Sequence, residues 1–255
     1  MKKILFVATM LAMVLSLSAQ RQMYVWQDGV KTTYEVANVD SITFGKVENP
    51  DPNTGATGSE NGYEYVDLGL SVKWATCNVG ATKPEEYGDY FAWGETQPKD
   101  YYDWSTYKWC NGSYNTLTKY NNSSSYGTVD NKTTLDLSDD AARANWGGSW
   151  RMPTKAEQDE LREQCTWTWT TQNGVNGYKV TSKKSGYTNK SIFLPAAGYR
   201  YDSSLSNAGS RGCYWSSSLL TGDPYDAYDL GFFSGYVGWG NGNRYVGFTV
   251  RPVCQ

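Results

Sequence analysis

Carboxylates are the first side chains of this sequence that could do chemistry. Glu95 is followed by Asp100 and Asp103, and two carboxyl groups held a few ångströms apart can hydrolyse a glycosidic bond. Spacing along a loop does not show whether such groups meet, and most Asp and Glu residues of a protein are solvated. The sequence therefore gives a hydrolytic pair no specific support.

A second acidic group consists of Asp136, Asp139 and Asp140. Calcium takes carboxylate oxygens as ligands, but these residues do not have the spacing of a calcium-binding loop. They precede Ala141-Ala142-Arg143-Ala144, and acidic side chains in the first turn of a helix interact favourably with its dipole. We therefore predict a short helix with Ser138 as its N-cap, and no metal site.

Histidine is absent from the 255 residues of the chain. Without imidazole there is no Ser-His-Asp or Cys-His nucleophile, no histidine-ligated zinc, and no iron site of two histidines and one carboxylate. The sequence thus predicts a protein that is not an enzyme and that has no cofactor.

Five cysteines are present, and none forms a C-x-x-C motif, which disfavours zinc ribbons and thioredoxin-type redox sites. In an exported protein an odd number of cysteines suggests up to two disulfides and one spare thiol. Their pairing stays open at this point. Cys213, beside Tyr214 and Trp215, could be a reactive thiol or the unpaired one, and we favour the second interpretation. The cysteines are Cys77, Cys110, Cys165, Cys213 and Cys254.

Aromatic residues dominate the composition, with 11 Trp and 21 Tyr. The region 96–149 is rich in Asn, Ser and Thr and is too polar to build a core alone, yet it carries many rings. Some rings must cover the sheet, and others should be exposed, where they stack on sugars or anchor a protein partner. From this region we predict ligand contacts by Trp104, Tyr107, Trp109 and Tyr114.

A second candidate binding surface is the glycine-rich run 238–244. We expect a turn here whose tip presents the indole of Trp239 and the amide of Asn241 to a ligand. The alternative interpretation is a hairpin turn without a binding role, which needs only the glycines. We favour the alternative but keep both residues as candidates.

Residues 145–161, NWGGSWRMPTKAEQDEL, predict the start of a helix that ends near Cys165. Thr154 and Glu157 have the spacing of a capping box. Catalysis by Arg151 and Glu157 would need a substrate cleft at this helix start. Packed tryptophans and a cap explain every residue type present, so we interpret the segment as structural.

The remaining patterns predict more strands than helices, without alternation, which indicates an α+β fold with a mainly antiparallel sheet. Asn173-Gly174 predicts a hairpin turn. The last predicted strand is 245–253, with Val246, Phe248 and Val250 on its inward face.

Domain organisation follows from turn and linker patterns. Asp28-Gly29 predicts a β-hairpin within 20–48. The segment 49–61 is rich in Pro, Gly, Asn and Thr and is predicted to be a linker. We expect one domain over 62–255.

The first 19 residues have the pattern of a signal peptide. Lys2 and Lys3 precede an apolar stretch over 4–17, and Ser18-Ala19 is a small-residue cleavage site. The stretch is shorter than the roughly 20 residues that span a bilayer. We expect an exported mature chain without a membrane span, located outside the cell, at its surface or in the periplasm. The net charge of −3 argues against a nucleic-acid partner.

Six segments of the chain follow one another in a recognisable order. They are VDLGLSVKWATCNVGA (66–81), EEYGDYFAWGE (85–95), WRMPTKAEQDEL (150–161), IFLPAAGYR (192–200), YWSSS (214–218) and VRPV (250–253). In this order they resemble the Fibrobacter succinogenes major paralogous domain family, which is common among exported proteins of gut Bacteroidota. The resemblance spans 62–255, and the hairpin region resembles a lead segment of such proteins.

That family is similar in turn to the C-type-lectin-like fold, including the formylglycine-generating enzyme group, where R-L-P-T-x-x-E-W opens a helix. The resemblance implies a twisted antiparallel sheet with two helices and a long irregular loop region. It also implies that the first and last strands of the domain are neighbours, and hence a disulfide between Cys77 and Cys254.

The sequence departs from the enzymes and sugar-binding lectins of this wider group. Iron-dependent relatives need a histidine site, which this chain lacks. The formylglycine-generating enzymes bind copper through a cysteine pair near the C-terminal end, whereas Cys213 and Cys254 are far apart in sequence. Residues 97–100, QPKD, only superficially resemble a lectin calcium motif, and no Trp-Asn-Asp follows.

The sequence therefore predicts an exported, non-enzymatic binding module that recognises a carbohydrate or a protein through aromatic-rich loops. Two alternatives remain. One is an oxidoreductase similar to the formylglycine-generating enzymes, and the other is a structural surface protein without a fixed ligand. The oligomeric state stays open.

Overall fold

The computed structural model describes residues 22–27, 30–35 and 55–255. The chain divides into two compact units, Met1–Glu48 and Asn49–Gln255. The predicted signal peptide lies outside the described residues. In the first unit, strands β1 (Gln22–Gln27) and β2 (Val30–Glu35) pair antiparallel with Gln27 opposite Val30, so the predicted hairpin with a two-residue connection is confirmed.

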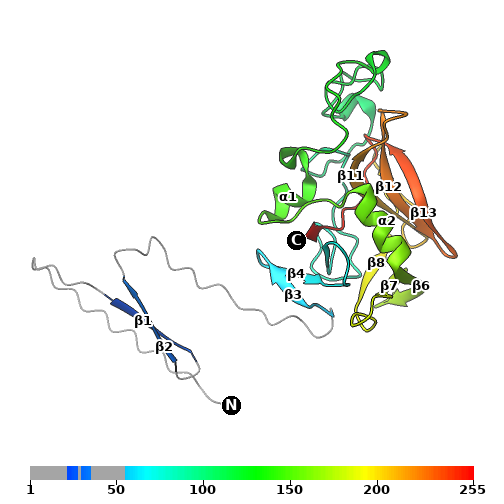
Figure 1. Cartoon of the computed structure of the whole chain (residues 1–255). Coiled ribbons are helices and arrows are strands. Elements are labelled where there is room, and N and C mark those ends of the chain that lie inside the picture. Colours follow the sequence, from blue (N-terminus) through cyan, green and yellow to red (C-terminus); the bar gives the residue numbers. More distant parts are fainter. Residues whose placement is uncertain (1–21, 28–29, 36–54) are drawn as a thin grey trace, which may run out of the picture. The chain divides into compact units, whose positions relative to one another are not determined.

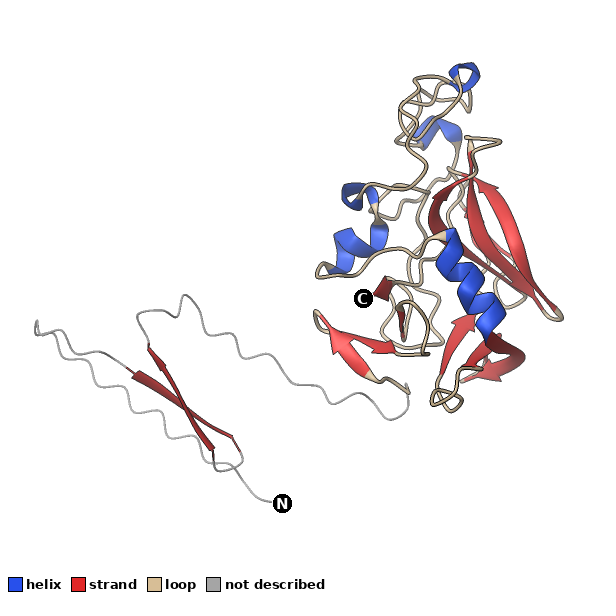
Figure 2. Ribbon diagram, viewed as in Figure 1, coloured by secondary structure: helices blue, strands red, loops and turns tan. Residues whose placement is uncertain are grey.

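The second unit consists of antiparallel sheets with two α-helices in its described part (Figures 1 and 2). The sheets have the strand orders β14-β5-β4-β3, β6-β7-β8, β10-β9 and β11-β12-β13. The predicted α+β class with mainly antiparallel pairing is confirmed. The elements are β3 (Gly58–Glu60), β4 (Tyr63–Val66), β5 (Lys73–Ala75), α1 (Ala141–Trp146), α2 (Lys155–Gln164), β6 (Cys165–Gln172), β7 (Val175–Ser182), β8 (Ser191–Pro195), β9 (Tyr199–Tyr201), β10 (Ser204–Ser206), β11 (Arg211–Leu219), β12 (Asp226–Phe233), β13 (Tyr236–Asn243) and β14 (Val253–Cys254).

Strand β3 lies inside the segment predicted to be a linker, so that part of the prediction is wrong. Glu60 pairs with Tyr63 across Asn61-Gly62, and both turn residues have positive φ, 48° and 85°. This is the geometry that Asn-Gly favours in a two-residue hairpin. The ordered sheet therefore begins before residue 62. The predicted hairpin at Asn173-Gly174 has the same geometry and is confirmed.

Helix α2 begins as predicted. The Thr154 hydroxyl accepts a hydrogen bond from the Glu157 amide, and the Glu157 carboxylate accepts one from the Thr154 amide. The same carboxylate forms a two-pronged ion pair with the guanidinium of Arg151. Figure 1 shows α2 lying across β11 and β12, where Leu161 is fully buried. Arg151 and Glu157 therefore fix the helix start to the sheet.

Helix α1 begins later than predicted. Ser138 lies in a single 3-10 turn, Leu137–Asp139, and does not cap the α-helix. The N-cap is Asp140, whose side chain accepts hydrogen bonds from the amides of Arg143 and Met152. Burial raises the pKa of Asp140 to about 6. The helix is thus capped by a buried carboxyl group, which also forms a hydrogen bond with the segment before α2.

The glycine-rich run 238–244 is not a turn, because it lies mostly within β13. The hairpin turn falls earlier, between Phe233 and Tyr236, which form a pair. Glycine is required at Gly240 because a side chain of the neighbouring strand comes close. A Cβ at this position would clash with the carboxylate of Asp229, its cross-strand partner. Glycine in a strand interior often marks such an approach.

The segment 245–253 is not a continuous strand. Isolated bridges join Phe248 to Phe91, Gly247 to Arg200 and Thr249 to Tyr214. The three residues predicted to face inward are buried, and Thr249 and Arg251 are buried as well. The segment therefore lies in the centre of the domain, where regular pairing with one neighbour is replaced by contacts with several. The inward residues are Val246, Phe248 and Val250.

The last strand of the domain, β14, pairs with the third, β5, whereas the first, β3, lies at the opposite edge of the same sheet, so the implied pairing of first and last strands is wrong. The disulfide between Cys77 and Cys254 is also not formed, and both thiols are free. Cys254 lies opposite Lys73, four residues before Cys77, so the strand register does not place the two cysteines opposite each other. All five cysteines are free.

Among the described residues, neither α-helix combines the length and the apolar character needed to cross a membrane.

Candidate functional site: an aromatic groove

The region 96–149 is held by hydrogen bonds of its own side chains. It contains no named strand and, before α1, only the 3-10 turns η2 (Trp104–Thr106), η3 (Ser124–Tyr126) and η4 (Leu137–Asp139) (Figure 2). The carboxylate of Asp130 accepts hydrogen bonds from the amides of Tyr120 and Asn121 at 2.9 and 3.0 Å. The loop is therefore an ordered surface rather than a linker.

Arg244 connects this region to the sheet. Its guanidinium is fully buried and donates to the carbonyl oxygens of Lys119, Tyr120 and Pro224 at 2.9–3.1 Å. It also donates from Nε to the hydroxyl of Tyr107 at 2.8 Å. The rigid planar fork of arginine suits several fixed acceptors at once. Two loops distant in sequence thereby meet beside the end of β13.

An open groove of about 430 Å³ lies at this meeting point. Three of its tyrosines contact one another, with ring centroids 5.2–6.2 Å apart, and Tyr114 is 48% exposed. No charged side chain lines it. The groove residues come from η2, the following turn, η3, the β11–β12 connection and the end of β13. They are Trp104, Tyr114, Tyr126, Tyr225 and Asn243.

The polar side chain of the groove has a fixed orientation. Asn243 donates its amide to Oδ1 of Asp226, and Asn241 donates to Oδ2 at 2.7 Å. Burial raises the pKa of Asp226, and the two amides oppose part of this rise. Because the NH₂ group of Asn243 is engaged, its amide oxygen is left as a hydrogen-bond acceptor at the groove.

Two of the predicted ligand-binding residues lie inside the domain. Tyr107 is 3% exposed, and its hydroxyl donates to the carbonyl of Trp93 at 2.7 Å. Trp109 is half-buried, with its indole nitrogen donating to Gly94 at 2.8 Å and the ammonium of Lys119 4.9 Å from its ring. Contact of Tyr107 with a ligand is thus excluded in this structure, and Trp109 serves packing.

The two residues predicted from the run 238–244 do not line the groove. Trp239 packs on α2, where its indole donates to Asp159 at 2.7 Å and the Lys155 ammonium lies 3.9 Å from its ring. Asn241 is exposed, but its amide is bound to Asp226. Trp104 and Tyr114 are therefore the predicted residues that the structure brings together.

Three groove residues were not among the predicted ligand contacts: Tyr126, Tyr225 and Asn243. Tyr126 belongs to the predicted aromatic loop and Asn243 to the run 238–244, whereas no pattern indicated Tyr225. Tyr225 and Asn243 lie about 100 residues further along the chain. Their approach to the loop depends on Arg244, which no local pattern reveals.

Three of the acidic residues considered for a hydrolytic pair or a calcium site have structural roles. Glu95 is buried and accepts hydrogen bonds from Lys99 and from the Lys108 amide. Asp103 caps η2. Asp139 pairs with Lys119 and accepts a hydrogen bond from the Tyr120 hydroxyl at 2.6 Å.

Within the described ranges, no cluster of three potential metal ligands is present. The aromatic groove is therefore the candidate site that combines exposed rings with a shaped surface. Comparisons of the chain with family models, curated proteins and solved structures find no match.

Proposed function

We propose that the chain is a non-enzymatic binding module that holds a neutral carbohydrate in the aromatic groove. The observation that carries this proposal is the contact among Tyr114, Tyr126 and Tyr225 beside Trp104 and an oriented amide. A pyranose ring has an apolar face of C–H groups and a rim of hydroxyls. Aromatic rings with polar tips match both properties.

Size and charge favour a sugar over a protein partner. The groove volume of about 430 Å³ is within the range of small-ligand sites, whereas a stable protein interface buries about 800 Å² on each partner. The lining has no charged residue, so a neutral ligand meets no desolvated charge. Arg244 and Asp226 hold the two walls in place, which limits the ordering entropy lost on binding.

The oxidoreductase alternative receives no support from the cysteines. Burial raises the pKa of Cys213 to about 12 and that of Cys254 to about 11. Copper binding and thiol redox chemistry use the thiolate, which such surroundings disfavour. We therefore keep the proposal of a binding protein.

We also propose that the domain has the C-type-lectin-like fold of the major paralogous domain family and that the chain is exported. The pairing of β14 with β5, the two helices and the long irregular region support the fold. The basic, apolar and small-residue pattern of residues 1–19 supports export to the cell surface, the periplasm or the exterior.

A glycan array followed by titration calorimetry tests the function. We expect the purified protein to bind neutral oligosaccharides, and Tyr114→Ala and Tyr126→Ala each to weaken binding at least tenfold, as stacked aromatic contacts predict. Tyr236→Ala is the matched control, because Tyr236 is also 48% exposed but lies in the β12–β13 hairpin outside the groove.

Two results would contradict the proposal. If no glycan binds, a structural surface protein without a fixed ligand becomes the better interpretation. If the control variant loses binding as strongly as the groove variants do, the ligand binds elsewhere. Circular dichroism of each variant confirms that the fold is kept.

A further inference from the structure

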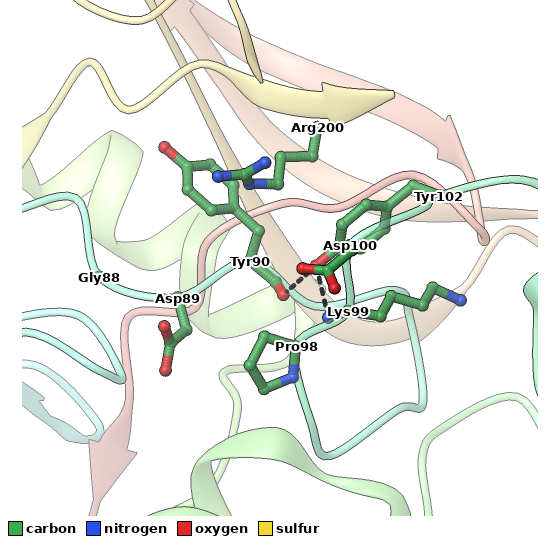
Figure 3. A pocket seen from close by; sticks show the side chains of 8 residues that line it. All are labelled: Gly88, Asp89, Tyr90, Pro98, Lys99, Asp100, Tyr102 and Arg200. Carbon is green, nitrogen blue, oxygen red and sulfur yellow. Dashed lines mark hydrogen bonds between the residues drawn. The ribbon is translucent and has the colours of Figure 1, made fainter. Parts of the chain in front are cut away.

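A second pocket, the polar pocket, shares no lining residue with the aromatic groove. It has a volume of about 300 Å³ and lies between the segments 88–90 and 98–102 and strand β9 (Figure 3). Its side chains combine two rings with charges of both signs. They are Asp89, Tyr90, Lys99, Asp100, Tyr102 and Arg200.

The aromatic floor of this pocket is fixed. Tyr90 and Tyr102 are both buried, and their hydroxyls donate to the carbonyl oxygens of Ala197 and Tyr90, each at 2.6 Å. The main chain of Arg200 exchanges two hydrogen bonds with Gly247 at 2.8 and 2.9 Å. The pocket walls are therefore set before any ligand arrives, as in most small-molecule sites.

One cation of the pocket is available and the other is engaged. The ammonium of Lys99 is bound by the Glu95 carboxylate at 2.9 Å and by the carbonyl of Thr106 at 3.0 Å. The guanidinium of Arg200 lies over the Tyr90 ring, 5.3 Å from its centroid, and has no hydrogen bond or ion pair with a carboxylate among the described residues (Figure 3). Its donors are thus open to an anionic group.

The two acids of the pocket are also available. Asp89 and Asp100 both line the pocket, and their carboxylates have no hydrogen bond or ion pair with another residue in the described part of the chain. A simple anion would meet these two negative charges. A simple cation would be repelled by Arg200. A ligand that carries both charges can pair with Arg200 and Asp100 and is not repelled by the second acid.

We propose that the polar pocket binds a small zwitterion of the α-amino acid class. The guanidinium of Arg200 pairs with the ligand carboxylate, for which its planar fork is suited. The ligand ammonium is bound by Asp100, and Asp89 adds a second negative charge to the lining. The rings of Tyr90 and Tyr102 contact the carbon skeleton.

Titration calorimetry with L-alanine, L-glutamate, L-lysine and L-tyrosine tests this proposal. Each amino acid is compared with its deaminated and its decarboxylated analogue. We expect at least one amino acid to bind, and both of its analogues to bind at least tenfold more weakly, because each leaves a charged group unpaired. Failure of all four amino acids to bind overturns the proposal, as does an analogue that binds as tightly as its parent.

Two variants locate the site. Arg200→Gln, and the double variant Asp89→Asn with Asp100→Asn, should each weaken binding of that amino acid at least tenfold. Arg143→Gln on α1 is the matched control and should leave affinity unchanged. If both pocket variants keep their fold by circular dichroism and bind like the parent protein, the proposal is wrong. The double variant decides alone if Arg200→Gln does not fold.

Discussion

Nη1 of Arg244 donates a hydrogen bond to the main-chain oxygen of Tyr120 at 3.1 Å, although the two residues are 124 positions apart in the sequence. The same nitrogen donates to the carbonyl of Pro224 at 3.0 Å. Each of the acceptors around this guanidinium is neutral, and the ring of Trp93 lies 4.9 Å from it. The groove therefore depends on one buried cation that joins its two walls.

Arg244→Lys should destabilise the domain strongly. The ammonium of lysine cannot reproduce the planar fork, so at least two buried carbonyl groups lose their donors. We expect the free energy of unfolding to fall by roughly 3 kcal/mol or more, measured by urea denaturation. Arg143→Lys, at a partly exposed position on α1, should change it by less than about 0.5 kcal/mol. Equal effects in the two variants would show that Arg244 has no special role.

Asp130 should stabilise the aromatic loop at neutral pH and lose this effect in acid. Partial burial opposes ionisation, but the amides of Tyr120, Asn121 and Lys132 hold the pKa of Asp130 below its usual value. Its contribution is therefore present above the unfolded pKa, about 4, and is lost as the pH falls through the lower folded pKa.

The variant Asp130→Ala tests this expectation. Its free energy of unfolding should be about 1–2 kcal/mol lower than that of the parent protein at pH 6. The two proteins should converge near pH 2, and Ser125→Ala, in an exposed part of the same loop, should match the parent at both pH values. A difference that persists unchanged in acid would indicate that packing, and not charge, explains the effect.

Asp229 should make the domain less stable as the pH rises. Burial raises its pKa to about 7; Arg211 opposes this rise in part, and Asp226 adds to it. Within the described residues, its Oδ2 atom has no hydrogen-bond partner. The protonated form is favoured in the folded state, so its stabilisation is complete below pH 4 and is lost as the pH rises through about 7.

Asp229→Asn should therefore flatten the dependence of stability on pH. Between pH 4 and pH 8 the parent protein should lose on the order of 3 kcal/mol more than the variant does, measured by urea denaturation at each pH. The buried Asp140 keeps its own smaller dependence in both proteins. Parallel curves for parent and variant would show that Asp229 does not titrate in this range.

The five cysteines should all be present as thiols. In denaturant without a reductant, alkylation should add five groups per chain by intact mass, because the structure contains free cysteines only. In the folded protein Cys110 should react first, since it is the partly exposed one. A mass with three added groups would reveal a disulfide, and peptide mapping would then identify its partners.

Local signals in the sequence were sufficient where both partners lie within a few residues. The capping box of Thr154 and Glu157 and the turn at Asn173-Gly174 formed as predicted. The same reasoning failed for the run 238–244, because its glycines accommodate close side chains, such as Asp229 at Gly240, and do not form a turn. Asn61-Gly62 carried the correct hairpin signal inside a segment whose composition indicated a linker.

The sequence by itself determined the class of the fold, the start of α2 and the richness of the surface loops in aromatic rings. The tertiary structure alone decided which rings face solvent. Tyr107 and Tyr114 have the same side chain and similar polar neighbours in the sequence. The hydroxyl of Tyr107 accepts a hydrogen bond from Arg244 in the core, whereas Tyr114 is exposed at the groove. Burial depends on partners more than 100 positions away, and local spacing carries no information about them.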